Sequence, residues 1–286
     1  MHIEHPQKLE PALYVVATPI GNLRDITLRA LDVLAGVDAV AAEDTRNTAH
    51  LLKHHGIHAR QLIAVHQHNE RGAAERLVLM LQQGLSVAFV SDAGTPAVSD
   101  PGALLVQAVM AAGLRVIPVP GASAAIAALS ASGLGAPHFL FYGFLPNKSV
   151  ARRTALQGLA IHPYTLVFYE APHRIVDCIA DLGAVLGGGR KIVFAREITK
   201  LFETIHACTL DEARVWLQGD ANRQRGEFVL LVSGAEPEAG ICAEAEGVLK
   251  LLLEELPLKQ AAQLAAKITG VNRSALYQLA LQMKRP

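Results

Sequence analysis

The fold is decided by the stretch Leu85-Ser86-Val87-Ala88-Phe89-Val90-Ser91-Asp92-Ala93-Gly94-Thr95-Pro96. Its first half is a continuous apolar run, typical of a strand buried on both faces of a parallel sheet, and its second half is a polar, glycine-containing turn. A helical pattern over 103–112 follows and ends at Gly113. A strand, a loop and a helix in this order form one unit of an α/β fold.

The same unit repeats along the chain on both sides of this stretch. Apolar runs predict further strands at 13–18, 37–42, 62–65 and 114–119, and helical spacing predicts helices at 28–35, 49–55 and 73–83. After the turn-rich residues 132–137, a second series predicts strands at 139–142, 165–169, 191–195, 203–206 and 227–232, with helices near 149–160 and 173–186. The first series predicts a parallel sheet. We therefore predict an α/β fold with two α/β domains, 1–132 and 133–236.

A third part follows a linker rich in Glu, Pro and Gly at 234–240. Residues 244–286 predict a helical extension of three helices, 244–256, 258–269 and one from Arg273, of which the last two resemble a helix-turn-helix. Its basic side chains are candidates for contact with RNA phosphates: Lys259, Lys267, Arg273, Lys284 and Arg285. The alternative is a helical cap or dimer element with solvated lysines.

The composition restricts the class of protein. Hydrophobic residues make up 51% of 286 residues and charged residues 18%, which argues against long disorder. Lys and Arg total 26, as do Asp and Glu, so any RNA site has to be a local patch. Residues 148–200, with eight basic and four acidic residues, predict such a patch, in which Lys148, Arg152 and Arg153 open a helix.

Cysteine usage and the chain start predict a cytoplasmic protein. Cys178, Cys208 and Cys242 are widely spaced and odd in number, so they predict neither a disulfide framework nor a zinc site. The first residues lack the pattern of a signal peptide. The charge-free stretch 116–147 contains several prolines and glycines, so we expect no membrane span there.

Four polar or glycine-rich loops follow the strands of the first series. They are Ala17-Thr18-Pro19-Ile20-Gly21-Asn22, Ala42-Glu43-Asp44-Thr45-Arg46, Ser91-Asp92-Ala93-Gly94-Thr95-Pro96 and Pro120-Gly121-Ala122-Ser123-Ala124. Open α/β sheets bind ligands at the carboxyl ends of their strands, so these loops predict one binding edge. Small residues let a ligand approach backbone groups, and Asp92 can accept from a hydroxyl or an ammonium group. The dinucleotide fingerprint and the P-loop motif are both absent from the sequence.

Together with Tyr169-Glu170-Ala171-Pro172-His173-Arg174, these loops resemble the tetrapyrrole-methylase superfamily. The resemblance covers roughly 13–283 and implies two α/β domains that hold S-adenosylmethionine in a cleft between them, commonly in a homodimer. The loop at 18–22 departs from the glycine- and aspartate-rich first loop of the tetrapyrrole members, which favours the rRNA-modifying branch. That branch implies methylation of the ribose 2′-hydroxyl of a cytidine in the decoding centre of 16S rRNA, with naked rRNA or the 30S subunit as substrate.

The resemblance also implies which residues contact the cofactor. The candidates are Pro19, Gly21, Asp92, Ala93, Gly94, Thr95, Ser123 and Ala124 in the first domain, with Phe168, Tyr169 and Glu227 in the second. A ribose hydroxyl is a poor nucleophile at neutral pH, so a base or a stabilising charge is expected nearby. The candidates for these catalytic roles are Glu43, Asp44, Arg46, Glu170, Arg174, Glu197 and Lys200, and the sequence leaves open which of them acts.

Two alternative functions and one alternative site remain open at the level of sequence. The first alternative function is methylation of a tetrapyrrole or another small molecule, and the second is RNA binding by a non-catalytic assembly factor. Six histidines fall between His50 and His68, and the His50–His54 spacing matches that of zinc ligands on a helix. An acidic partner at zincin spacing is missing and methyl transfer needs no Lewis acid, so we expect no metal.

Overall fold

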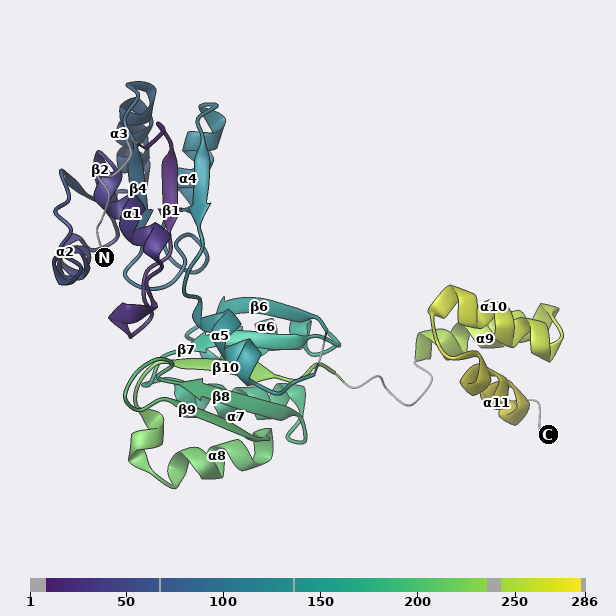
Figure 1. The fold of residues 1–286 in the computed structure, drawn as a ribbon. Helices are drawn as coiled ribbons and strands as arrows, with labels where there is room; N and C mark the ends of the chain where they lie inside the picture. The colour runs from purple at the N-terminus through teal and green to yellow at the C-terminus, as the bar shows by residue number, and fades with distance from the viewer. Residues whose placement is uncertain (1–8, 67, 136, 236–242, 284–286) are drawn as a thin grey trace. The chain divides into compact units, whose positions relative to one another are not determined.

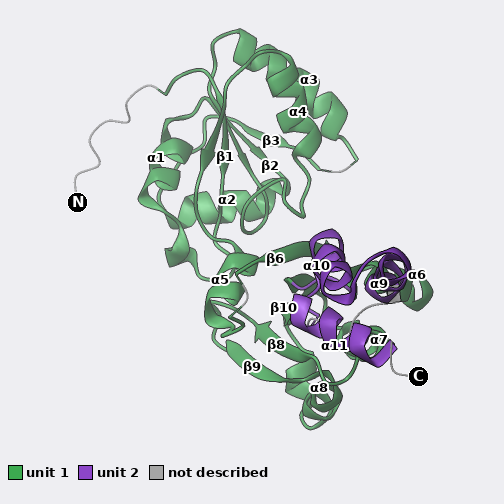
Figure 2. Cartoon of the chain, turned by 90° about the vertical axis from the view of Figure 1, so that its right-hand side faces the viewer, with its two compact units in different colours: residues 1–160, 164–233 green, residues 161–163, 234–286 purple. Residues whose placement is uncertain are grey.

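The computed structural model describes residues 9–66, 68–135, 137–235 and 243–283, and within them the chain forms two compact units. Residues up to 160 together with 164–233 form unit 1, and residues 161–163 together with the segment from 234 form unit 2 (Figure 2). Unit 1 contains both predicted sheets (Figure 1). None of the helices in the described residues is long and apolar enough to cross a membrane.

The first sheet is fully parallel, as predicted, with strand order β3-β2-β4-β1-β5. Its strands are β1 (Leu13–Val16), β2 (Ala39–Ala42), β3 (Leu62–Ala64), β4 (Val87–Val90) and β5 (Val116–Val119). The helices between them are α1 (Leu28–Gly36), α2 (Thr45–His54), α3 (Glu70–Gln82) and α4 (Ala103–Ala111), with a short 3-10 helix η1 (Leu23–Asp25). Helices α1 and α2 pack on one face of the sheet, and α3 and α4 pack on the other. Both faces are covered, which explains the unbroken apolar run of β4.

The second sheet is mixed, with strand order β6-β7-β10-β8-β9. Its strands are β6 (Phe139–Phe144), β7 (Thr165–Glu170), β8 (Lys191–Arg196), β9 (Thr204–Thr209) and β10 (Phe228–Val232). β6 and β7 are parallel, and the other neighbouring pairs are antiparallel. Helices α6 (Ser149–Leu159), α7 (Ile175–Leu186) and α8 (Leu210–Gln218) cover one face, around the buried Phe168 and Phe194. A 3-10 helix, η2 (Ala221–Gln224), follows α8.

The other face of the second sheet is covered by α5 (Ala124–Ala131). Ala125 and Ala128 of α5 pack against Val167, Val193 and Val229 of this sheet. The predicted division at residue 132 assigned this segment to the first domain. The packing favours a division nearer to residue 120, directly after β5, which we propose in its place.

Unit 2 contains three helices, α9 (Ala243–Glu255), α10 (Leu258–Thr269) and α11 (Arg273–Met283). Their core is formed by Leu249, Ala261, Ala265 and Leu276 among others. Gly270 ends α10 with a left-handed φ of 72°, and the side chain of Asn272 accepts a hydrogen bond from the Ser274 N–H at 2.8 Å to begin α11. The predicted helix-turn-helix is therefore present. Lys284, Arg285, Cys242 and most of the predicted linker lie outside the described residues.

Candidate active site

The loops after β1, β4 and β5 form one wall at the carboxyl edge of the first sheet. The backbones of Thr18 and Gly94 exchange two hydrogen bonds, of 2.9 and 3.0 Å. The Thr95 hydroxyl donates to the Ala122 carbonyl at 3.1 Å. Gly94 has a φ of +74°, a conformation that side chains rarely adopt, and this allows the two strand-like segments to pair.

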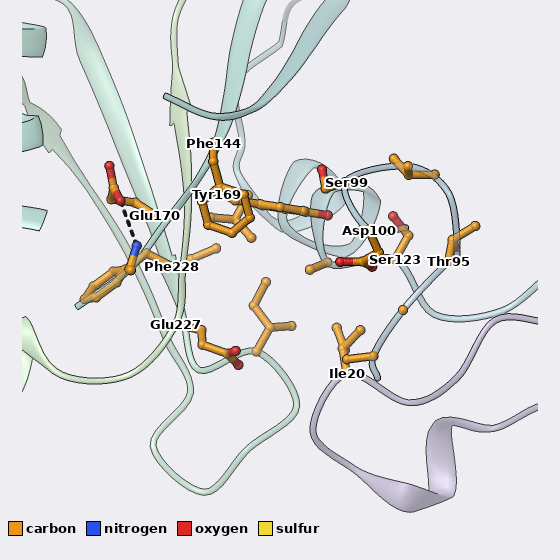
Figure 3. Close-up of a pocket in the computed structure, with 18 of the residues that line it drawn as sticks. Ile20, Thr95, Ser99, Asp100, Ser123, Phe144, Tyr169, Glu170, Glu227 and Phe228 are labelled. Carbon is orange, nitrogen blue, oxygen red and sulfur yellow. Dashed lines mark hydrogen bonds between the residues drawn. The ribbon is translucent and has the colours of Figure 1, made fainter. Parts of the chain in front are cut away.

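A cavity of about 330 Å³ lies against this wall (Figure 3). This volume is within the range of small-ligand sites. From the first half of unit 1 it is lined by Ile20, Ala93, Gly94, Thr95, Val98, Ser99, Asp100, Ser123 and Ala124. From the second half it is lined by Phe144, Tyr169, Glu170, Ala171, Pro172, Ala195, Ile198, Lys200, Glu227, Phe228 and Val229. The loops of the two sheets therefore form a single pocket.

Asp100 is the carboxylate on the first-sheet side of the pocket. Burial raises its pKa and the negative charge of Asp92 adds to the rise, while a hydrogen bond with Ser91 opposes it. In Figure 3 the Tyr169 side chain extends from the second sheet toward the loop that carries Ser99 and Asp100. Burial raises the pKa of this phenol, so Tyr169 stays protonated at neutral pH.

Lys200 is the cation of the pocket, on the second-sheet side. Its Nζ lies 3.0 Å from Glu197 Oε1 and 2.5 Å from Glu227 Oε2. Burial would lower its pKa, but the hydrogen bonds to Glu227 and Glu197 raise it above the ordinary value, so Lys200 remains an ammonium group. Glu227 also donates its backbone N–H to Glu197 Oε1 at 2.9 Å. The three side chains therefore hold one another in place.

Comparison with known proteins identifies the family. Residues 12–214 match the family of Tetrapyrrole (Corrin/Porphyrin) Methylases, and residues 239–284 match the RsmI C-terminal HTH domain. The chain is 53% identical over 273 residues to ribosomal RNA small subunit methyltransferase I of Escherichia coli O157:H7, covering 95% of each chain. It is 55% identical to the protein of that name from Pseudomonas aeruginosa, covering 94% of this chain and 96% of the relative. The chain belongs to the ribosomal RNA small subunit methyltransferase I family.

Membership of this family confirms that the protein is an rRNA methyltransferase. The predictions of a superfamily resemblance and of enzymatic activity are confirmed, and the non-catalytic alternative is not supported. Solved structures agree on the fold. The methyltransferase CobJ matches with a TM-score of 0.59 at 23% identity, covering 78% of this chain and 94% of that one. Uroporphyrin-III C-methyl transferase from Thermus thermophilus complexed with S-adenyl homocysteine matches with a TM-score of 0.53 at 20% identity, covering 77% and 96%.

Within this family fold, the structure brings most of the predicted cofactor residues to the pocket. Those that line it are Ala93, Gly94, Thr95, Ser123, Ala124, Tyr169 and Glu227. Pro19, Gly21, Asp92 and Phe168 are not among the lining residues. Phe168 is buried in the core beneath the second sheet. A side chain at Gly21 would approach Lys200 Cγ to 2.6 Å, so this loop packs directly against the second-sheet wall.

Asp92 contacts the loop after β2 instead of the pocket. Its carboxylate accepts from the Asp44 N–H at 3.2 Å and from the Asn47 side-chain amide at 3.0 Å. Its own N–H donates to Glu43 Oε2 at 3.3 Å. Burial raises the pKa of Glu43, and the neighbouring carboxylates add to the rise. The β2 and β4 loops are thus fixed to each other by polar contacts.

Of the predicted catalytic residues, only Glu170 and Lys200 line the pocket. Glu43, Asp44, Arg46, Arg174 and Glu197 do not, although Glu197 holds Lys200. Asp44 and Arg46 form an ion pair of 2.6 Å at the beginning of α2, and the hydrogen bond from Arg46 lowers the pKa of Asp44 to about 2. Glu43 and Asp44 therefore stabilise loop and helix ends, and their predicted catalytic roles gain no support from the geometry.

Glu170 lines the pocket and forms a largely buried ion pair with Arg174, which does not. Arg174 Nε lies 3.1 Å from Glu170 Oε1, and the same oxygen accepts from the Ala171 N–H at 2.8 Å. Arg174 also donates to the Leu145 carbonyl at 2.6 Å. Glu170 Oε1 and Arg174 thus fix the turn after β7, which shapes the pocket, while Glu170 Oε2 is buried without a hydrogen-bond partner among the described residues.

Sequence reasoning missed Asp100, Ser99 and Phe144, which all line the pocket. Asp100 precedes Pro101-Gly102 at the start of α4, so it lies in the same long loop after β4 as the predicted residues. A signal was therefore available: the ligand loop extends to the next helix, and a carboxylate near its end faces the same edge of the sheet. For Phe144, the extension of β6 beyond the predicted end at 142 was not visible in the apolar pattern.

The predicted basic patch at 148–200 is wrong in part, because much of its charge is neutralised. The Arg152 side chain is 3% exposed, and its Nε lies 2.7 Å from Asp181 Oδ2. Arg153 pairs with the other oxygen of Asp181 at 2.5 Å. Lys148 and Lys191 remain exposed. Charge counted along a segment thus overstated the charge available to RNA.

The described histidine, cysteine and acidic side chains include no group of three that could hold a metal ion. Cys178 and Cys208 are free cysteines. Burial raises the pKa of Cys178, so this thiol stays protonated. Neither residue lines the pocket.

Proposed function

We propose that this rRNA methyltransferase transfers the methyl group of S-adenosylmethionine to the ribose 2′-hydroxyl of cytidine 1402 in 16S rRNA. The observation that carries this proposal is the single pocket formed by the loops of both sheets, with a net negative lining. Asp100, Glu170 and Glu227 line it against one cation, Lys200. Such a lining favours a ligand with net positive charge, as a sulfonium with an ammonium and a carboxylate has.

The lining also combines a carboxylate, helix N–H groups and apolar side chains, which match the different parts of this cofactor. Asp100 provides a negative charge for the cationic methionine end. Ser123 and Ala124 begin α5, whose unpaired N–H groups and dipole favour a carboxylate. Phe144, Tyr169 and Val229 provide apolar surface for a nucleobase. The cofactor, when bound, supplies an electrophilic methyl group.

The residues of the chain contribute mainly alignment and electrostatics. The paired Thr18 and Gly94 backbones and the Glu197–Lys200–Glu227 network form rigid opposite walls, which favours one orientation of the reacting atoms and excludes water. Lys200 is held protonated, so it stabilises negative charge that develops on the ribose oxygen and does not accept its proton. Asp100, with its raised pKa, is the lining carboxylate better matched to proton acceptance than an ordinary aspartate.

Two measurements test this function. Calorimetry with S-adenosylmethionine should show saturable binding to the intact protein. Incubation with labelled cofactor and unmethylated 30S subunits should place one label on the ribose of the target cytidine. A label found on the base, or retained when the target is a 2′-deoxycytidine, would exclude ribose transfer. Naked 16S rRNA in the same assay separates the two substrate forms, and sedimentation tests the homodimer that the family resemblance implies.

A further inference from the structure

An exposed apolar turn continues the second-sheet wall of the pocket. Ile198 and Lys200 line the pocket, and the next two residues, Leu201 and Phe202, are 89% and 65% exposed. Contiguous exposed apolar surface points to an interaction site, whereas single scattered apolar residues do not. The turn is therefore a candidate contact for the substrate that reaches the pocket.

The turn is rigid. Glu197 and Thr199 have left-handed φ values of 52° and 68°, which cost free energy in residues other than glycine. The Thr199 N–H donates to Glu203 Oε2 at 2.6 Å, and Lys200 is held by Glu197 and Glu227. These contacts offset the cost of the strained backbone. The turn therefore holds Leu201 and Phe202 in one conformation.

A buried guanidinium holds the backbone of the exposed Phe202 near that of an exposed arginine. Arg196, which is 9% exposed, donates from Nε to the Arg225 carbonyl at 2.6 Å and from Nη1 to the Phe202 carbonyl at 3.1 Å. The backbones of Phe202 and Arg225 are therefore neighbours. The Arg225 side chain is exposed and has no ion-pair partner among the described residues.

We infer that Phe202 stacks on a nucleobase of a single-stranded stretch of the rRNA, and that Arg225 binds an adjacent phosphate, so that the target ribose is delivered to the pocket. An exposed aromatic side chain and an exposed arginine on neighbouring backbone segments suit single-stranded nucleic acid, since the ring can stack on a base while the cation neutralises the backbone. This inference rests on the proposed function, because it assigns the substrate contact of the same pocket.

The test compares variants of the intact protein. Phe202→Ala should lower kcat/KM on unmethylated 30S subunits by about fivefold or more, which is the loss expected from one base stack. Phe202→Trp should retain most of the activity. Val215→Ala on α8, where Val215 is 72% exposed, is the matched control and should behave as the wild type. Cofactor affinity and thermal unfolding should be unchanged in all three variants.

A synthetic RNA with the target cytidine, and its counterpart lacking one base, distinguishes stacking from a general loss of binding. Removing the stacked base should weaken binding to the wild type and have little further effect on Phe202→Ala, because the two changes remove the same contact. Arg225→Gln should reduce the slope of log affinity against log salt by about one, whereas the control Arg214→Gln should leave it unchanged.

Two outcomes overturn the inference. The first is a Phe202→Ala variant that methylates as well as Val215→Ala. The second is a Phe202→Ala variant that dissociates a wild-type dimer, because the turn would then be an interface between two copies. Failure of the proposed function is a different result, since the wild type would then bind no S-adenosylmethionine or would leave the ribose unlabelled.

Discussion

At the scale of single residues, Asp100 has opposite effects on binding and stability. Its pKa is raised by burial and by Asp92, so the folded protein binds a proton there more tightly than the unfolded chain does. Ionisation of Asp100 therefore lowers the free energy of unfolding as the pH rises through the raised pKa. We expect Asp100→Asn to raise the melting temperature at neutral pH and to weaken S-adenosylmethionine binding.

The same substitution should change the pH dependence of binding. Wild-type affinity should fall as the pH is lowered through the raised pKa, because a protonated Asp100 no longer attracts a cation. Asp100→Asn should show a weaker dependence, and the exposed Asp32→Asn on α1 should match the wild type. Calorimetry at several pH values checks this, and an Asp100→Asn variant with wild-type affinity at neutral pH would disprove the assigned role.

A second prediction about a single residue concerns Asp181 and the stability of the fold alone. Its side chain is 3% exposed and accepts from Arg152, Arg153 and the Ser149 hydroxyl, which hold its pKa below the ordinary value against the effect of burial. Removing one partner of a buried ion pair leaves an uncompensated charge, which costs about 3–5 kcal/mol. Asp181→Ala should lower the free energy of unfolding by that amount in urea denaturation. Asp177→Ala, on the exposed side of the same helix, should change little.

At the scale of elements, the start of α3 caps α4 and so supports the pocket loop. Glu70 Oε1 accepts from the N–H groups of Gly102, Leu104 and Leu105 at 2.9, 3.0 and 3.4 Å. Loss of a helix cap costs about 0.5–2 kcal/mol. Glu70→Ala should lower stability by about that much and also weaken cofactor binding, because the freed N–H groups begin two residues after Asp100. Glu75→Ala on the exposed side of α3 should affect neither quantity.

The elements also show how far the sequence could predict the fold. The strands of the first sheet were found within a few residues, because strands covered on both faces are continuous apolar runs. Helix α8 was missed, although Thr209 and Glu212 form a capping box at its beginning that is readable as T-x-x-E. Helix α5 was not separated from its neighbours, since its run of alanines lacks the polar face that marks an amphipathic helix.

The sequence could predict which loops lie at the site, but it could not predict what each side chain in those loops does. Parallel strands bring their carboxyl ends to one edge, and the loop segment 93–95 and Ser123 line the pocket at that edge. Asp92 could not be assigned in this way, because its carboxylate binds the N–H of Asp44, which is 48 residues away in sequence. Asp44 is different, since it caps α2 through the N–H of Arg46 two residues on, a local signal that its predicted catalytic role overlooked. Asp181, which neutralises Arg152, is 29 residues away in sequence.

At the scale of the whole molecule, the helical extension allows one decisive experiment. Unit 2 has its own core, and Lys259, Lys267 and Arg273 are exposed on it. If these side chains contact rRNA, truncation after Ala235 should leave S-adenosylmethionine binding intact and sharply reduce methylation of 30S subunits.

Replacing the three basic residues by alanine in the full chain separates phosphate contact from a structural role. The variant should reduce the slope of log kcat/KM against log salt by up to about three, one for each lost phosphate contact. A structural cap predicts the opposite pair of results: truncation would lower the melting temperature of unit 1, and the triple variant would methylate as the wild type does. Exposed Lys250 on α9, replaced by alanine, controls for the general loss of positive charge.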